Sequence, residues 1–250
     1  MGRIVAAMES MQAPELFTRP PEEDPQQLDA GIAARQRLGK VLDDTKPEAL
    51  NIFASDHFET FFQKWVPTFA VVADNTAATA CSGRTWALPL NSLLAEGLLD
   101  GLVNRSFDLS NLQDATLGHS FETIFVSTSL PPLPTNYQCA ALGAAIADIN
   151  APRPEHLAPI GGGGISHPLD TVRTTEMLPW AAVLGAIGDL HLEVLSYQET
   201  THPGHGVVRF HEGAHPEKNR AAAPLTKFNQ NCSGSQAPGI PTGRRISHLN

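Results

Sequence analysis

Short apolar runs along this chain alternate with longer stretches in which apolar residues recur every three or four positions. The short runs predict β-strands at Arg3–Met8, Ala49–Ala54, Thr68–Ala73, Thr123–Thr128, His156–Ile160 and His191–Tyr197. The helical spacing predicts helices at Ala30–Leu42, Leu90–Val103, Tyr137–Ile149 and Pro179–Ile187. Strands that alternate with helices are typical of a mostly parallel sheet covered on both faces. The pattern therefore predicts an α/β fold: a single domain with a central mixed, largely parallel sheet flanked by helices.

The regular pattern ends near Phe210. From residue 211 to residue 250 the chain is rich in Gly, Pro, Ser, Asn and charged residues and shows little periodicity. We therefore expect a folded domain over residues 1–210, followed by a polar, loosely ordered tail over residues 211–250.

Composition narrows the range of partners. The chain has 250 residues, 42% of them hydrophobic and 17% charged, with a net charge of −9. This composition suits a globular protein with a core and offers no basic stripe, which disfavours nucleic acid and anionic membranes as partners. No apolar run reaches the ~18 residues of a membrane span, and the start lacks a basic segment followed by a long apolar one.

The three cysteines, Cys81, Cys139 and Cys232, are widely spaced and form no C-x-x-C pair. Neither a disulfide framework nor a thiolate zinc site is indicated. A reducing cytoplasm is the expected location.

Four consecutive glycines, Gly161 to Gly164, precede Ser166 and His167. Glycine costs about 0.5–1 kcal/mol relative to alanine in a regular element, so four together indicate either a mobile loop or an unusual turn. The run lacks the Gly-Lys-Ser/Thr ending of a phosphate-binding loop, so a phosphate role is disfavoured. The alternative is a tight turn that brings His167 into a crowded site.

Polar residues with catalytic chemistry lie near the ends of the predicted strands. His57 follows the second strand, His119 precedes the fourth, His167 follows the fifth, and Glu176 lies at the entry to the last helix. Ligands in parallel sheets bind beyond the carboxyl ends of the strands. Each residue also has an ordinary structural interpretation: His57 as the first residue of a helix capped by Asp56, His119 as a half-buried histidine, and Glu176 as a solvated first-turn acid.

In combination, the segments "SDHFETFF", "GGGGISH" and "EMLPWAAVLGAIGD" occur in one order along the chain. Through these segments the sequence resembles the class III extradiol ring-cleaving dioxygenases, the family of the protocatechuate 4,5-dioxygenase β subunit. The resemblance runs from Arg3 to Phe210 and includes "PTFAVVAD", "PPLPTNYQCAALGAAI" and "GHGVVRF". It implies that residues 1–210 form a catalytic domain of this type.

In that family two histidines and one glutamate hold a non-haem Fe(II), which leaves room for both catecholate oxygens and O2. The resemblance implies that His57 and Glu176 are metal ligands and that His167 is the catalytic acid–base. His119 falls where the family has a polar residue near the substrate. The substrate implied is a small aromatic diol, cleaved together with O2.

The chain departs from the family at two places. The first-ligand histidine of the family is replaced by Gln12, whose neutral amide oxygen is a weaker donor to Fe(II) than imidazole. Glu9 is a candidate to substitute for the missing ligand, but three residues away on a strand it points to the opposite face. His167 and Glu176 are only nine residues apart, whereas the family has a longer, partly helical segment there.

Two functions from different classes remain. The first is an Fe(II) extradiol dioxygenase; the second is a non-catalytic relative that acts as a structural or regulatory subunit, in a homo-oligomer or beside a partner subunit. A hydrolase using Ser166 and His167 is disfavoured, because neighbouring residues on an extended chain point to opposite faces and no G-x-S-x-G elbow is present. Metal content per chain discriminates between the first two.

Overall fold

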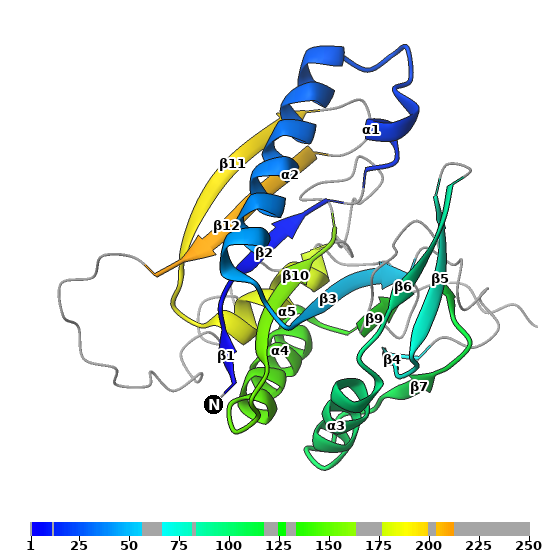
Figure 1. Ribbon diagram of the computed structural model, residues 1–250, viewed down its shortest axis with the longest axis vertical. Coiled ribbons are helices and arrows are strands. Elements are labelled where there is room, and N and C mark those ends of the chain that lie inside the picture. The colour runs from blue at the N-terminus through cyan, green and yellow to red at the C-terminus, as the bar shows by residue number, and fades with distance from the viewer. Residues whose placement is uncertain are drawn as a thin grey trace, which may run out of the picture. The chain divides into compact units, whose positions relative to one another are not determined.

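The centre of the molecule is a nine-stranded mixed sheet, shown in the computed structural model of Figure 1. The structure describes residues 2–11, 13–56, 67–81, 84–117, 125–128, 134–163, 177–199 and 204–212. Across the sheet the strands are β11 (His191–Glu199), β12 (Gly204–His211), β2 (Ala7–Ser10), β10 (His156–Gly161), β3 (Ala49–Asp56), β9 (Phe125–Thr128), β4 (Phe69–Val72) and β7 (Ser110–Leu112). A ninth strand, β1 (Arg3–Ile4), pairs with the start of β10.

Four adjoining strands at the middle of the sheet, β2, β10, β3 and β9, run parallel. On one side β12 pairs antiparallel with β2 and β11 antiparallel with β12; on the other, β4 pairs antiparallel with β9. The predicted mixed α/β architecture is therefore confirmed, and its parallel part is the centre of the sheet.

The helices begin where the sequence offers good caps. α2 (Pro25–Thr45) starts after Asp24, whose side chain accepts a hydrogen bond from the backbone N–H of Gln26. α4 (Asn136–Asn150) starts after Thr135 with a full capping box to Gln138. The other helices are α1 (Glu15–Thr18), α3 (Ser92–Val103) and α5 (Leu178–Ile187). All four predicted helices are present.

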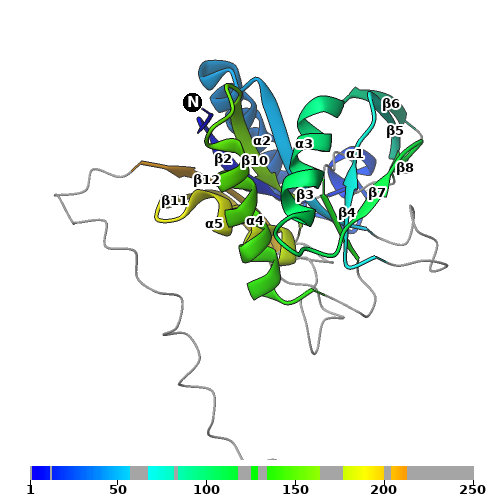
Figure 2. The same ribbon diagram turned by 90° about the horizontal axis from the view of Figure 1, so that it is seen from below.

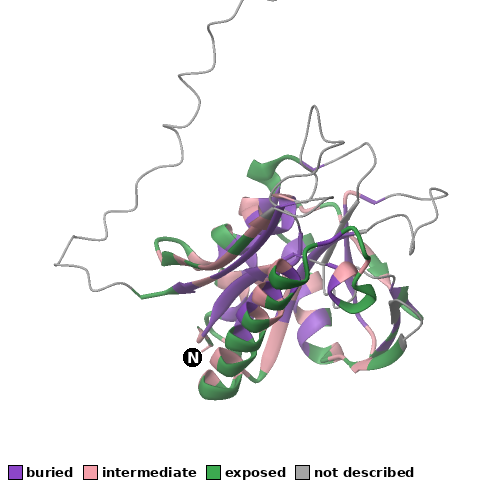
Figure 3. Cartoon of the chain, turned by 90° about the horizontal axis from the view of Figure 1, so that it is seen from above, coloured by how far each residue is buried: buried purple, intermediate pink, exposed green. Residues whose placement is uncertain are grey.

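Helices cover both faces of the sheet. Successive strand residues send their side chains to opposite faces, so each strand contributes to a core on either side. In β10, Leu157 packs into a core with α3, α4 and α5, whereas Ala158 packs into a second core with α2. In β12, Val208 packs into the core with α3, α4 and α5, and Val207 packs into the core with α2. Figure 2 shows α2 and the α4–α5 pair on opposite sides of β10. Figure 3 shows that the buried residues concentrate in the central strands.

α4 and α5 lie in very close contact. A β-carbon at Gly143 would lie 1.8 Å from the carbonyl oxygen of Ala182, and one at Gly185 would lie 1.9 Å from that of Ala140. Any side chain at either position would force the two helices apart. These glycines allow α5 to pack closely against α4.

Several elements were not predicted. A second, three-stranded sheet joins β6 (Arg84–Pro89), β5 (Thr76–Cys81) and β8 (Thr116–Leu117). β7, β12 and the four-residue helix α1 were also missed. The predicted strand at Arg3–Met8 is in fact two strands, β1 and β2, and the second continues to Ser10.

Contacts divide the chain into two units, Met1–Gly213 and Ala214–Asn250. All of the helices and strands above belong to the first. The predicted tail at residues 211–250 lies beyond the described residues from position 213 onward, so its looseness stays a prediction.

Candidate functional site

The carboxyl ends of the parallel strands meet at one edge of the sheet. β2 ends at Ser10, β10 at Gly161, β3 at Asp56 and β9 at Thr128. Ligands collect at this edge in α/β sheets because loops there are free to carry polar side chains. Position 12, the glycine run and position 57 therefore follow the ends of β2, β10 and β3, three neighbouring strands that end at this edge.

The side chains predicted to form the site lie outside the described residues. This is true of Gln12, His57, His119, His167 and Glu176 alike. Their predicted convergence therefore stays a prediction. The structure describes what adjoins them: the strand ends, the first glycines and the start of α5.

The first turn of α5 is fixed at this same edge. The indole Nε1 of Trp180 donates a 3.1 Å hydrogen bond to the carbonyl oxygen of Gly163, and both residues are buried. The backbone N–H of Gly162 donates to the carbonyl of Phe53 at 2.7 Å, which continues the sheet beyond the last residue of β10. The chain that follows Glu176 thus enters its helix directly beside the glycine run.

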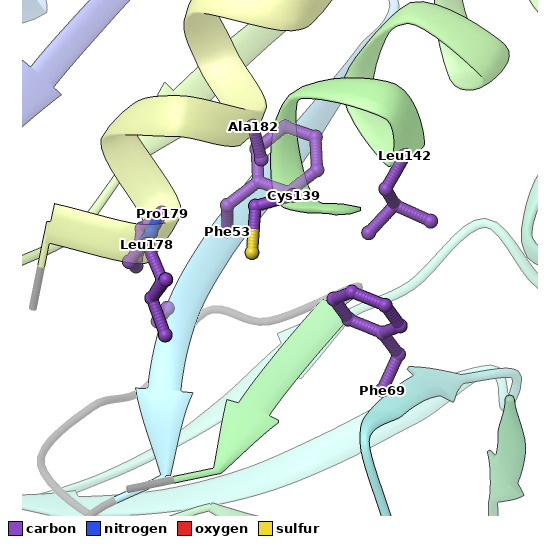
Figure 4. Close-up of a pocket in the computed structure, with 8 residues that line it drawn as sticks. Phe53, Phe69, Cys139, Leu142, Leu178, Pro179 and Ala182 are labelled. Carbon is purple, nitrogen blue, oxygen red and sulfur yellow. The ribbon is translucent and has the colours of Figure 1, made fainter. Parts of the chain in front are cut away.

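A small apolar cavity lies between this helix start and the sheet (Figure 4). Its lining residues come from β3, β4, α4 and α5; they are Phe53, Ala54, Phe69, Cys139, Leu142, Leu178, Pro179 and Ala182. The enclosed space is about 10 Å³, roughly enough for a single water molecule. The lining is apolar and includes two aromatic rings, so the cavity is a small gap in the packing between α4, α5 and the sheet.

Cys139 lines this cavity as a free thiol. Burial raises the pKa of Cys139 to about 12. The thiol therefore stays protonated at neutral pH and is neither a nucleophile nor a thiolate ligand.

The first glycine of the run has a packing role that the sequence did not reveal. A β-carbon at Gly161 would lie 3.0 Å from Cγ of Glu9 and 3.1 Å from Cγ2 of Val183. Gly161 is the last residue of β10 and pairs with Glu9 of β2. A β-carbon here would be crowded, so the Glu9 side chain or Val183 would have to shift by a few tenths of an ångström to admit it.

Glu9 itself is completely buried, and neither of its carboxyl oxygens has a hydrogen-bond partner in the described part of the chain. Burial raises the pKa of Glu9 well above its ordinary value. Its proximity to Val183 places the side chain on the α5 face of the sheet. The sequence argument against Glu9 assumed that one strand continues to position 12. β2 ends at Ser10, so strand alternation does not decide how Glu9 and residue 12 are oriented relative to each other.

A second polar cluster lies on the opposite face, at the same end of β2. His205 Nε2 and Glu15 Oε1 are 2.7 Å apart, with only 2% of the His205 side chain exposed. Arg35 donates from Nε to Ser10 Oγ at 2.8 Å and from Nη2 to the carbonyl of Met11. Burial lowers the pKa of Arg35 to about 10, a shift that the nearby charge of Glu15 opposes. The cluster fixes the backbone immediately before position 12.

Sequence reasoning considered Glu9 but set it aside, and it missed the cluster around His205. Glu9 carried a usable signal, since it is the one acid in the otherwise apolar run "IVAAME". His205 appeared in the quoted segment "GHGVVRF", but nothing local indicated that its partner is 190 residues away in α1.

Among the described residues, no group of three or more His, Cys, Asp or Glu side chains is arranged to hold a metal ion. Within the same residues, no helix has the length and apolar character needed to cross a bilayer.

No protein-family model matches the chain. The chain is 27% identical over 151 residues to the 2,3-dihydroxyphenylpropionate/2,3-dihydroxicinnamic acid 1,2-dioxygenase of Photorhabdus laumondii, covering 53% of this chain and 47% of that protein. It is 28% identical over 165 residues to the protein of the same name from Mycolicibacterium paratuberculosis, covering 59% and 52%. A third, from Cupriavidus necator, is 28% identical over 151 residues, covering 54% and 47%. The chain spans about half the length of these curated relatives.

The structure is also similar to the crystal structure of an uncharacterized protein from Escherichia coli K12. The TM-score is 0.56 at 14% identity, over 84% of this chain and 100% of that one. At this identity the likeness concerns the fold alone.

Proposed function

We propose that this chain is an extradiol (meta) ring-cleaving dioxygenase that acts on a small catecholic aromatic compound with non-haem Fe(II) and O2. The observation that carries the proposal is the match of about half the chain to relatives named as dioxygenases of dihydroxylated aromatic acids. The proposal includes the class III family, with residues 1–210 as the catalytic domain, and a cytoplasmic location.

In this proposal His57, Glu176 and Gln12 are the metal ligands, and His167 and His119 are the catalytic residues. Its geometric support comes from the described strand ends. Asp56 precedes His57 at the end of β3, and the residues flanking Gln12 and the glycine run end two parallel strands beside it. A mixed set of imidazole and carboxylate donors suits Fe(II) and leaves coordination positions open.

The reaction inserts both atoms of O2 and breaks the ring C–C bond beside the diol, which yields a carboxylic acid and an aldehyde or ketone. When bound, Fe(II) supplies the site at which both catechol oxygens and O2 are held and exchange electron density. His167 takes a proton from a catechol hydroxyl and returns one later, for which an unperturbed histidine pKa near 6.5 is well placed.

Anaerobic reconstitution with Fe(II), followed by catechol or 2,3-dihydroxyphenylpropionate and O2, tests the proposal. We expect O2 uptake together with the yellow absorbance of a ring-opened muconic semialdehyde. His167→Ala should retain iron yet lose roughly 10²–10⁴-fold in turnover, whereas His57→Ala should lose iron first. Ser166→Ala is the matched control and should stay active, since the proposal gives Ser166 no role. Iron-loaded protein that consumes neither catechol nor O2 would overturn the proposal.

The alternative is a non-catalytic relative that serves as a structural or regulatory subunit. Gln12 favours it, because an amide stands where the family places an imidazole. Wild-type protein should then bind well under one iron per chain. Gln12→His separates the two: a joint rise of iron affinity and cleavage points to a weakened enzyme, and no gain in either points to the subunit.

A further inference from the structure

Asn51 places a polar amide inside the apolar core on the α4–α5 face of the sheet. It lies in β3 between Ala49 and Phe53, which alternation puts on the same face and which both pack into that core. The residue is 1% exposed, and neither its Oδ1 nor its Nδ2 has a hydrogen-bond partner among the described residues. A buried amide without hydrogen bonds is costly, and such groups are few in native proteins.

A second buried amide, that of Asn150, is left only partly satisfied. Asn150 is the last residue of α4 and is 2% exposed. Its Nδ2 donates to the carbonyl oxygen of Glu155 at 3.4 Å, but its Oδ1 has no partner within the described part of the chain. A strand and a helix therefore each contribute an amide, and together the two amides hold three polar atoms in need of a partner.

Asn51 and Asn150 line one small cavity between the sheet, α4 and α5. Its other walls include the apolar side chains of Ile4, Ile146 and Leu157. The enclosed space is about 10 Å³. A buried water needs about 10–15 Å³ by this kind of measure and two to four polar partners, whereas a cavity with only apolar walls stays dry. The size excludes a larger ligand, and the two amides provide the partners that a water requires.

We propose that this cavity is a binding site for one structural water molecule, which joins β3 to the end of α4. The water donates hydrogen bonds to Oδ1 of Asn51 and to Oδ1 of Asn150, and it accepts one from Nδ2 of Asn51. Buried waters typically make about three hydrogen bonds, so this set is complete for the water. Each amide atom also gains a partner of the type that its chemistry requires, an acceptor for the N–H and a donor for each oxygen.

The inference is independent of the proposed function. Ile4 and Leu157, which line the cavity, pair with each other near the start of β10. The candidate metal site instead adjoins the carboxyl ends of the strands. A result on the water therefore leaves the dioxygenase proposal untouched, and an inactive protein leaves the water site untouched.

A high-resolution crystal structure of the full-length wild type tests the site directly. We expect a single density peak at hydrogen-bonding distances of about 2.5–3.2 Å from the three amide atoms. Two side-chain amides that bond to each other instead, or a cavity without such a peak, would overturn the proposal. This test needs no substitution, so it does not depend on whether a variant folds.

Magnetic relaxation dispersion of the solvent counts long-lived internal waters in solution. Asn51→Val removes two of the three partners and keeps a side chain that suits a strand, so this variant should hold one fewer long-lived water than wild type. Asn51→Ser keeps a polar group beside the cavity and should retain the water. Asn111→Val, at an exposed asparagine of β7, is the matched control and should equal wild type. An unchanged count in Asn51→Val would contradict the assignment.

A double-mutant cycle shows whether the two amides share this water. Asn51→Val and Asn150→Ala should each lower the melting temperature, and the double variant should lose less than the two single losses added together. The reason is that either substitution already deprives the remaining amide of its partner. The bond from Asn150 to Glu155 is lost in both Asn150 variants, so it cancels in the cycle. Strictly additive losses would mean that Asn51 and Asn150 have no common partner, which overturns the water bridge.

Discussion

Two acids near the end of β2, the half-buried Glu15 and the fully buried Glu9, have opposite surroundings on the two faces of the sheet. On the α2 face, Glu15 meets His205 at 2.7 Å, and Arg35 is close enough for the two charges to interact. On the α5 face, Glu9 has no partner for either oxygen in the described chain. One face therefore satisfies its acid within the protein, and the other leaves its acid unsatisfied.

The difference separates a structural group from a candidate functional one. A paired acid ties elements together, here α1 to β12 through Glu15 and His205. An unpaired buried acid weakens the fold and persists where a ligand or proton compensates. The two faces should accordingly respond to substitution with opposite signs of stability change.

The largest effect is expected from breaking the pair on the α2 face. His205→Ala leaves Glu15 without its buried partner, and such losses typically destabilise a protein by about 3–5 kcal/mol. Urea denaturation measures the change, with His156→Ala, an exposed histidine of β10, as the control. A loss no greater than that of the control would mean that this face is not held by the pair.

Added crowding at Gly161 on the α5 face should cause a smaller loss of folding stability. Gly161→Ala places a methyl group 3.0 Å from Glu9 Cγ and 3.1 Å from Val183 Cγ2, and overpacking of this kind costs about 1–3 kcal/mol. The penalty should shrink when Glu9 is shortened, so a double-mutant cycle with Glu9→Ala measures the contact. Gly39→Ala is the control, because nothing lies within 4 Å of its new methyl group. Additive effects in the cycle would show that Glu9 does not lie over Gly161.

The hydrogen bond that fixes the start of α5 should contribute less. Trp180→Phe removes the donor to Gly163 and keeps an aromatic ring in place. A typical intramolecular hydrogen bond contributes about 0.5–1.5 kcal/mol, which thermal unfolding of wild type and variant should resolve. Unchanged stability would indicate that the loop after β10 is held by other contacts.

In metal-free protein, Glu9→Gln should change the melting temperature least at low pH. As pH rises, the variant should become increasingly more stable than wild type. The folded-state pKa of Glu9 lies above its unfolded value, so the folded state holds a proton that the unfolded state releases. Wild-type stability therefore falls relative to that of the variant from about pH 4.5 upward, since 4.5 is the ordinary pKa of a glutamate side chain. Melting temperatures at pH 5 and pH 8 in the presence of a chelator measure the gap, with Glu22→Gln, which replaces an exposed acid, as the control. A gap that narrows with pH would mean that Glu9 is ionised and paired in the native state.

Much of the fold could be predicted because local patterns and tertiary packing agree. α2, α3, α4 and α5 lie where apolar residues recur at helical spacing, and each predicted strand is present. β12 and the β5–β6 hairpin were missed. β12 begins with the Gly-rich "GHG", and its pairing with β2, almost 200 residues earlier, leaves no local trace.

The site was only partly predictable. The sequence places His57, His167 and Glu176 next to strand ends and a helix start, and the parallel centre of the sheet accounts for why those ends share one edge. Their side chains lie outside the described residues, so their roles stay predictions. The argument against Glu9 relied on strand alternation as far as position 12, but β2 ends at Ser10, so that argument stays a prediction.

What the sequence determined by itself is what depends on neighbours along the chain: helix periodicity, the caps at Asp24 and Thr135, and the short apolar strands. The tertiary structure alone decided what depends on residues far apart in sequence. Gly161 is crowded because it pairs with Glu9, 152 residues earlier in the chain (161 − 9), and Gly143 is required because a β-carbon there would meet the backbone of α5. Whether an acid is paired, like the half-buried Glu15, or has no hydrogen-bond partner in the described chain, like the buried Glu9, is likewise set by which elements the fold brings together. Local sequence cannot specify this, because a carboxylate's electrostatic environment is fixed by spatial neighbours rather than by chain neighbours.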